Sequence, residues 1–125
     1  VAFTEGRTAL YWAVCNGRED AIRLLLKHQA NPSLGDKDGD TPLHLASALG
    51  MPHVVEILLA GGASLSQRMR NGFTPLHRLA DNERLQPGHL ETVRLLLARG
   101  ADPSAVSLEG AQGLHLAAFH GHTEL

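Results

Sequence analysis

The sequence Thr41-Pro42-Leu43-His44-Leu45-Ala46 combines the signals that begin an α-helix. The threonine hydroxyl accepts a hydrogen bond from a free backbone N–H of the first turn, and proline at the first helical position removes no hydrogen bond. Gly50 is predicted to end this helix, because glycine adopts the left-handed conformation without strain. A second helix is predicted before Gly61-Gly62, since one broad apolar face is formed by Val54, Val55, Leu58 and Leu59.

The same signals return at a fixed interval. Gly6, Gly39 and Gly72 are 33 residues apart, as are the threonines that precede the predicted helices. Gly110 follows Gly72 by 38 residues, so five residues have been inserted, and the other repeated positions place them within 81–87. The residues after each second helix lack helix signals and end in a glycine turn, which indicates an extended β-turn finger. Each unit is therefore predicted to be helix, helix, finger.

This motif and period resemble the signature of the ankyrin repeat family, Thr-Pro-Leu-His-x-Ala. The resemblance implies an all-α fold, an ankyrin repeat solenoid of stacked helix-turn-helix units with β-turn fingers. The chain is expected to be one domain, 1–125, with repeats at about 3–35, 36–68, 69–106 and an incomplete fourth at 107–125. Tyr11 replaces the signature histidine, Leu79 replaces the signature alanine, and Gln112-Gly113 replaces Thr-Pro. We expect these departures to change local packing and not the fold.

Composition excludes several classes of function. The 125 residues carry 11 Lys+Arg against 13 Asp+Glu, so there is no positive excess to release counterions from a nucleic acid. No apolar run approaches the ~18 residues of a membrane span, and no secretory signal is recognisable. Cys15 is the single cysteine and forms no internal disulfide, which suits a reducing compartment. A cytoplasmic or nuclear protein is expected, with no nucleic acid or membrane partner.

The chemistry-bearing residues favour structural roles. His44, His77 and His115 share one repeat position, which in the family implies contacts between neighbouring turns. The pair His120 and His122 lacks a further ligand at zinc-like spacing. The sequence 36–40 departs from a calcium loop, and Cys15 has no recognisable base near it in sequence. We therefore expect no enzyme, no metal site and no cofactor; catalysis that depends on Cys15 or His120 is the alternative.

The resemblance further implies that finger tips and inner helix faces hold a protein partner in a groove. We define finger two as residues 35–40 and finger three as residues 68–73. Finger two is acidic and finger three basic, so the groove is expected to orient a partner. Phe73 is predicted to be an exposed aromatic anchor beside Arg70. The predicted partner-binding residues are Arg7, Lys37, Asp38, Asp40, Leu49, Arg70, Asn71, Phe73, Asp81, Asn82, Glu109, Phe119 and His120.

Two further points stay open in the sequence. The insertion Glu83 to Pro87 is expected to lengthen the loop between the two helices of the third repeat, either as a contact or as a tolerated addition. The first repeat is apolar, with Trp12 and Ile22, so the chain is expected to belong to a longer array or to borrow surface from a partner. A structural or self-associating spacer is therefore the alternative function.

Overall fold

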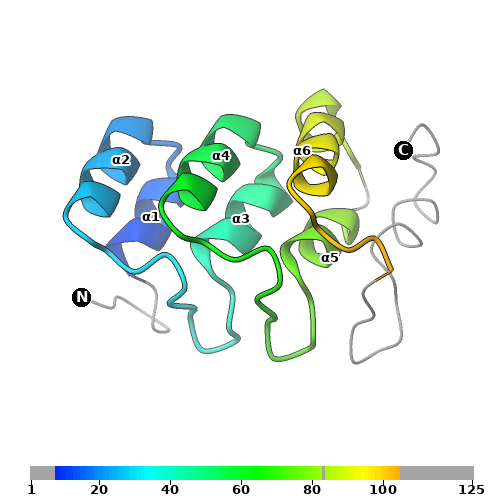
Figure 1. Ribbon diagram of the computed structural model, residues 1–125, viewed down its shortest axis with the longest axis horizontal. Helices are drawn as coiled ribbons and strands as arrows, with labels where there is room; N and C mark the ends of the chain where they lie inside the picture. Colours follow the sequence, from blue (N-terminus) through cyan, green and yellow to red (C-terminus); the bar gives the residue numbers. More distant parts are fainter. Residues whose placement is uncertain (1–7, 83, 105–125) are drawn as a thin grey trace.

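The computed structural model describes residues 8–82 and 84–104, and every helix in these ranges belongs to a pair. The pairs are α1 (Ala9–Cys15) with α2 (Glu19–Lys27), α3 (Pro42–Leu49) with α4 (Pro52–Ala60), and α5 (Pro75–Ala80) with α6 (Pro87–Ala98). They stand side by side in a row (Figure 1). We call α1, α3 and α5 the inner helices and α2, α4 and α6 the outer helices. The predicted all-α solenoid of stacked helical pairs is confirmed.

Threonine begins each inner helix. Thr8, Thr41 and Thr74 have extended backbones, and each side-chain oxygen accepts the N–H of the third helical residue at 3.2–3.4 Å. Proline occupies the first helical position of α3 and α5. Gly50 follows α3 with a φ of +69°, in the left-handed region. These helix boundaries therefore arise from the local signals that the sequence displays.

The core lies between the inner and outer helices. Leu43 on α3 and Leu58 on α4 are fully buried, and Leu96 takes the position of Leu58 in the next pair. The first pair is covered less completely, because Leu24 on α2 remains 57% exposed. In the part of the chain that the structure describes, no helix has the length and apolar character needed to cross a membrane.

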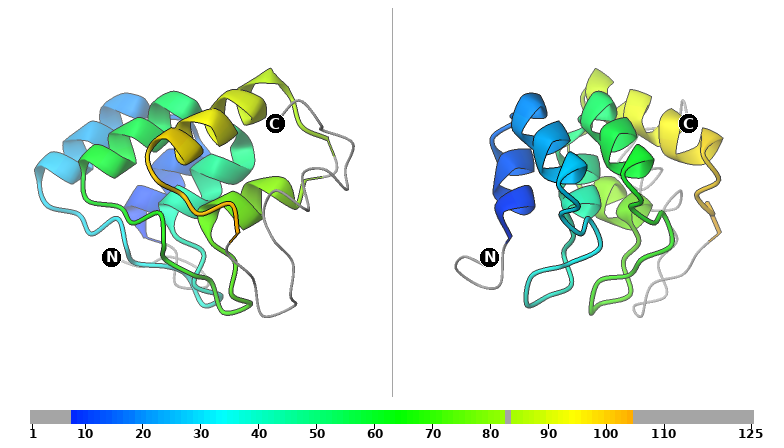
Figure 2. Two further views of the ribbon diagram at one scale, coloured as in Figure 1. Left: turned by 45° about the vertical axis from the view of Figure 1, so that its right-hand side comes forward. Right: turned by 60° about the vertical axis from the view of Figure 1, so that its left-hand side comes forward.

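The connections from α2 to α3 and from α4 to α5 extend beyond both layers of helices. They form the long narrow loops at the bottom of Figure 1, and both views of Figure 2 show them next to each other. Fingers two and three are the far ends of these loops. The inner helices follow the fingers directly, so a finger and the start of an inner helix are fixed relative to each other.

Candidate functional site

Fingers two and three are in contact at Gly39. This residue has a φ of +78°, and a Cβ atom placed on it would lie 3.1 Å from Met69 Cα and 3.3 Å from the Arg70 backbone nitrogen. The backbone N–H of Arg70 donates to the carbonyl oxygen of Asp38 at 2.9 Å. The two fingers therefore form one ridge with a fixed spacing, which we call the finger ridge.

Four of the predicted partner-binding residues lie on the finger ridge. Lys37, Asp38 and Arg70 are exposed, and Asn71 is partly exposed. Arg70 donates from Nη1 to the Lys37 carbonyl oxygen at 3.3 Å. The side-chain oxygen of Asn71 accepts the backbone N–H of Phe73 at 3.0 Å and so stabilises the turn. The structure thus brings these four residues together from segments 33 residues apart.

Asp40 was expected at an exposed finger position, and this expectation is wrong. Its exposed fraction is 5%. The Tyr11 hydroxyl donates to Asp40 Oδ2 at 2.8 Å, and Arg78 Nη2 lies 3.9 Å from the same oxygen. A buried carboxylate requires such partners, because removing its charge from water is costly. Asp40 therefore connects α1 and α5 to finger two and is not free to meet a partner.

His44, at the position of the signature histidine, contacts finger three much as Tyr11 contacts finger two. His44 Nε2 lies 2.9 Å from the carbonyl oxygen of Phe73, and Tyr11 likewise reaches a residue 29 positions ahead. Thr41 contacts His44 Nδ1 with its hydroxyl at 2.7 Å and its N–H at 3.4 Å. Nδ1 is therefore the acceptor, and Nε2–H donates to the carbonyl. Burial lowers the pKa of His44 from 6.5 to about 4, because desolvation disfavours the charged ring.

Phe73 was expected as an exposed anchor, and this expectation is also wrong. Its exposed fraction is 6%, and its ring stacks on the imidazole of His77 with a centroid distance of 5.5 Å and an interplanar angle of 24°. His77 lies on α5, which directly follows finger three. The ring is therefore covered by the inner helix of its own repeat.

The predicted residues at the ends of the inner helices differ in their availability. Leu49 is 45% exposed and Asp81 is exposed. Asn82 is partly buried and donates from Nδ2 to the carbonyl oxygens of Ala48 at 3.2 Å and Leu79 at 2.6 Å. Asn82 therefore caps α3 and α5, whereas Leu49 and Asp81 face solvent.

The residues after α5 lengthen the loop, as the sequence led us to expect, and they also lengthen the next helix. Six residues separate α5 from α6, whereas two separate α3 from α4. Pro87 is the first residue of α6, which has 12 residues where α2 and α4 each have 9. The insertion thus gives α6 an additional turn. Glu83, at the start of the predicted loop, lies outside the described residues.

The additional turn of α6 packs on the end of α3. A Cβ atom placed on Gly88 would lie 2.6 Å from the carbonyl oxygen of Gly50, so this contact requires glycine. His89 Nδ1 accepts the N–H of Gln86 at 3.0 Å, and its Nε2 lies 2.9 Å from the carbonyl oxygen of Ala48. The first turn of α6 is therefore joined to α3 by a hydrogen bond from His89 and by the close backbone contact of Gly88.

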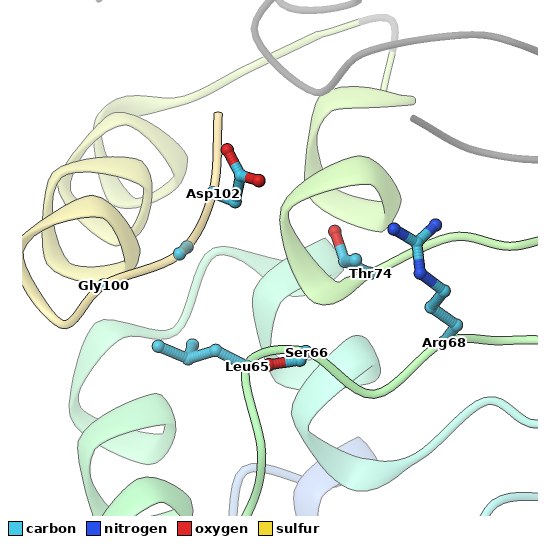
Figure 3. Close-up of a pocket in the computed structure, with 7 residues that line it drawn as sticks. Leu65, Ser66, Arg68, Thr74, Gly100 and Asp102 are labelled. Atoms are coloured by element: carbon cyan, nitrogen blue, oxygen red, sulfur yellow. The ribbon is translucent and has the colours of Figure 1, made fainter. Parts of the chain in front are cut away.

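A small cavity lies between the connection from α4 to α5, the residue Thr74 that caps the N-terminus of α5, and the residues that follow α6 (Figure 3). Its volume of about 210 Å³ is below the range of roughly 300–1,000 Å³ typical of small-molecule sites. Arg68 lines it and donates from Nη1 to the Gly72 carbonyl oxygen at 2.8 Å. Arg68 was not among the predicted partner-binding residues, although its place in the basic finger three, two residues before Arg70, could have suggested it. The lining is Leu65, Ser66, Arg68, Thr74, Gly100, Ala101 and Asp102.

Four predicted partner-binding residues, Arg7, Glu109, Phe119 and His120, lie outside the described residues. His115 and His122 do so as well. Within 8–82 and 84–104, no three His, Cys, Asp or Glu side chains are grouped to hold a metal ion. Cys15 is exposed at the end of α1.

The family of the chain follows from comparison with known proteins. A family model described as ankyrin repeats (3 copies) matches residues 2–69 and 29–107. No curated protein matches the chain. Ankyrin repeats are generally protein–protein interaction modules, and the family is typically non-catalytic. The matched residues span most of the sequence and include the three helical pairs, so the chain belongs to the ankyrin repeat family.

Proposed function

We propose that this chain is a non-catalytic module that binds a protein partner through the finger ridge and the exposed ends of the inner helices. One observation carries the proposal: some charged side chains of the finger ridge are exposed, whereas other side chains there are buried by contacts within the fold. Lys37, Asp38 and Arg70 are exposed on a rigid framework, whereas Asp40 and Phe73 are buried. Binding residues concentrate on such loops, because a scaffold positions them without restricting their side-chain chemistry.

The ridge carries both signs of charge. Asp38 follows Lys37 in the sequence, and its carbonyl oxygen accepts the backbone N–H of Arg70. Asp36 Oδ1 accepts the N–H groups of Asp38 and Asp40 at 2.9 and 3.1 Å within its own finger. Mixed charges at the edge of an interface chiefly orient a partner and speed its association. Leu49 and Asp81 complete the proposed surface at the helix ends.

Affinity capture with matched variants tests this proposal. The chain is immobilised and exposed to lysate of its source organism, and captured proteins are compared between wild type, Arg70→Glu and Leu49→Ser. Arg94→Glu is the control, because Arg94 is exposed on the outer helix α6. We expect the first two variants to lose a partner that the control retains, with unchanged thermal unfolding. Loss in the control alone would place the binding surface on the outer helices and reject the proposal.

Self-association is the second candidate, and exposed leucines favour it. Leu24 and Leu34 are 57% and 52% exposed, in the first helical pair and in the connection that follows it. Large exposed apolar side chains are common at contacts between copies. Sedimentation velocity over a range of concentrations should then show a dimer that Leu24→Glu abolishes. A constant monomer mass would exclude this candidate.

A further inference from the structure

The guanidinium of Arg70 is positioned but makes no ion pair with a carboxylate of the described residues. Its backbone N–H is held by the Asp38 carbonyl at 2.9 Å, and Nη1 by the Lys37 carbonyl at 3.3 Å. An arginine side chain has five N–H donors, of which the Lys37 carbonyl takes one, and Arg70 is exposed. A preorganised guanidinium loses less freedom on binding than a mobile one.

The neighbouring side chains add to this positive charge. Arg68 is held against the backbone of finger three by its hydrogen bond to the Gly72 carbonyl at 2.8 Å. Lys37 is exposed on finger two, next to the carbonyl that Arg70 contacts. Asp38 is the exposed carboxylate among them, because Asp40 is buried and Asp36 accepts two backbone N–H groups. Among the exposed charged side chains of the finger ridge, three are therefore positive and one is negative, and Asp36 adds a half-buried carboxylate.

Gly39 fixes the distance between these charges. Its left-handed backbone and the 3.1 Å approach of its potential Cβ to Met69 Cα both disfavour any side chain at this position. A larger residue would separate finger two from finger three and break the contacts of Arg70 with Asp38 and Lys37. The cationic arrangement is thus built into the backbone.

We infer that the partner contributes an extended acidic segment, one carboxylate of which binds the guanidinium of Arg70. The inference rests on the proposed function and specifies the chemistry of its partner. A guanidinium matches a carboxylate in a planar, bidentate arrangement that an ammonium does not reproduce. Lys37 and Arg68 attract further carboxylates on either side, and Asp38 disfavours a segment of uniform charge by repulsion.

The test pans a display library of random linear peptides against the whole chain. Selected peptides should be enriched in Asp and Glu, and their affinity should fall about tenfold with Arg70→Ala. Arg70→Lys should restore little of this loss, since lysine has the positive charge but lacks the planar, bidentate N–H donors of a guanidinium. Gly39→Ala should weaken binding as well, whereas Arg94→Ala on α6 should bind like wild type.

A second arm replaces the required carboxylate of a selected peptide with phosphoserine. Binding no tighter than the parent peptide supports a carboxylate as the ligand, and markedly tighter binding would assign the site to phosphate instead. Selected peptides without acidic residues, or unaffected by Arg70→Ala, would overturn the inference and leave the proposed function standing. If the chain selects no peptide but captures a protein partner from lysate, the inference is likewise overturned and the proposed function stands. If the chain selects no peptide and captures no partner, the proposed function fails as well.

Discussion

Acidification should destabilise this chain through His44. The buried ring accepts a hydrogen bond at Nδ1 from Thr41 and donates from Nε2 to the carbonyl of Phe73, which is the pattern of the neutral form. A proton added to Nδ1 would face the Thr41 N–H and break that contact. The perturbation is therefore a fall in pH, and His44→Gln removes the titrating group.

The magnitude follows from the pKa of His44. Burial lowers it from 6.5 to about 4, so the unfolded chain binds this proton more tightly than the folded chain. The stabilisation of the neutral ring is complete above pH 6.5 and is lost as the pH falls toward 4. The shift corresponds to about 3 kcal/mol in total, or about 1 kcal/mol per pH unit between these values.

Urea unfolding at a series of pH values measures this effect. Trp12 is the only tryptophan, so its fluorescence, together with helical circular dichroism, reports the transition. The free energy of unfolding of wild type should fall more steeply below pH 6.5 than that of His44→Gln, by about 1 kcal/mol per unit. His53→Gln, at an exposed position on α4, is the control and should follow wild type. Parallel curves for wild type and His44→Gln would refute the reasoning.

Four further substitutions, of which Leu24→Ala is a control, test the fold and the corrected positions by chemical unfolding. Leu58→Ala should cost about 2–5 kcal/mol, because the side chain is fully buried, whereas Leu24→Ala at a 57% exposed position should be nearly neutral. Equal effects would contradict the assignment of the core. Phe73→Ala should cost about 3–5 kcal/mol, and an unchanged midpoint would show that the ring is not packed on α5. Gly88→Ala should destabilise the chain, since its methyl group would lie 2.6 Å from the Gly50 carbonyl oxygen; wild-type stability would show that α6 does not pack there.

The sequence was sufficient for the elements that depend on local signals. Threonine caps, proline at the first helical position and Gly50 are properties of a few adjacent residues, and the structure has them as predicted. The buried leucine of α4 and of α6 follows from the periodicity, since Leu58 and Leu96 occupy the same repeat position. Such features need no knowledge of distant neighbours.

The exposed surface was harder to predict, because burial depends on residues far away in the chain. Asp40 and Phe73 occupy one repeat position, next to the capping threonine, and differ entirely in chemistry. Both are buried, Asp40 by the Tyr11 hydroxyl and Phe73 by the ring of His77. A carboxylate and an aromatic ring at a turn suggest solvent or a partner until these neighbours are known.

The insertion shows a similar limit. Counting residues located the insertion and predicted the longer loop between α5 and α6, but it did not reveal that α6 is longer as well. Pro87 was the usable signal, since proline favours the first helical position, and it begins α6 in the structure. The contact of Gly88 with Gly50 depends on the crossing of two helices and leaves no trace in the local sequence.

The hydrogen bonds of Tyr11 and His44 to residues later in the chain affect the order in which the helices unfold. Each side chain donates to an acceptor 29 positions later. Finger two therefore accepts one such bond at Asp40, and α3 donates the next one from His44. A row connected in this way frays from its outermost members, and its middle opens only together with a neighbour. Among the helices that the structure describes, the backbone amides of α3 would consequently exchange with deuterated solvent last. A molecule seated on finger two would then rest on the part of the chain that opens most rarely.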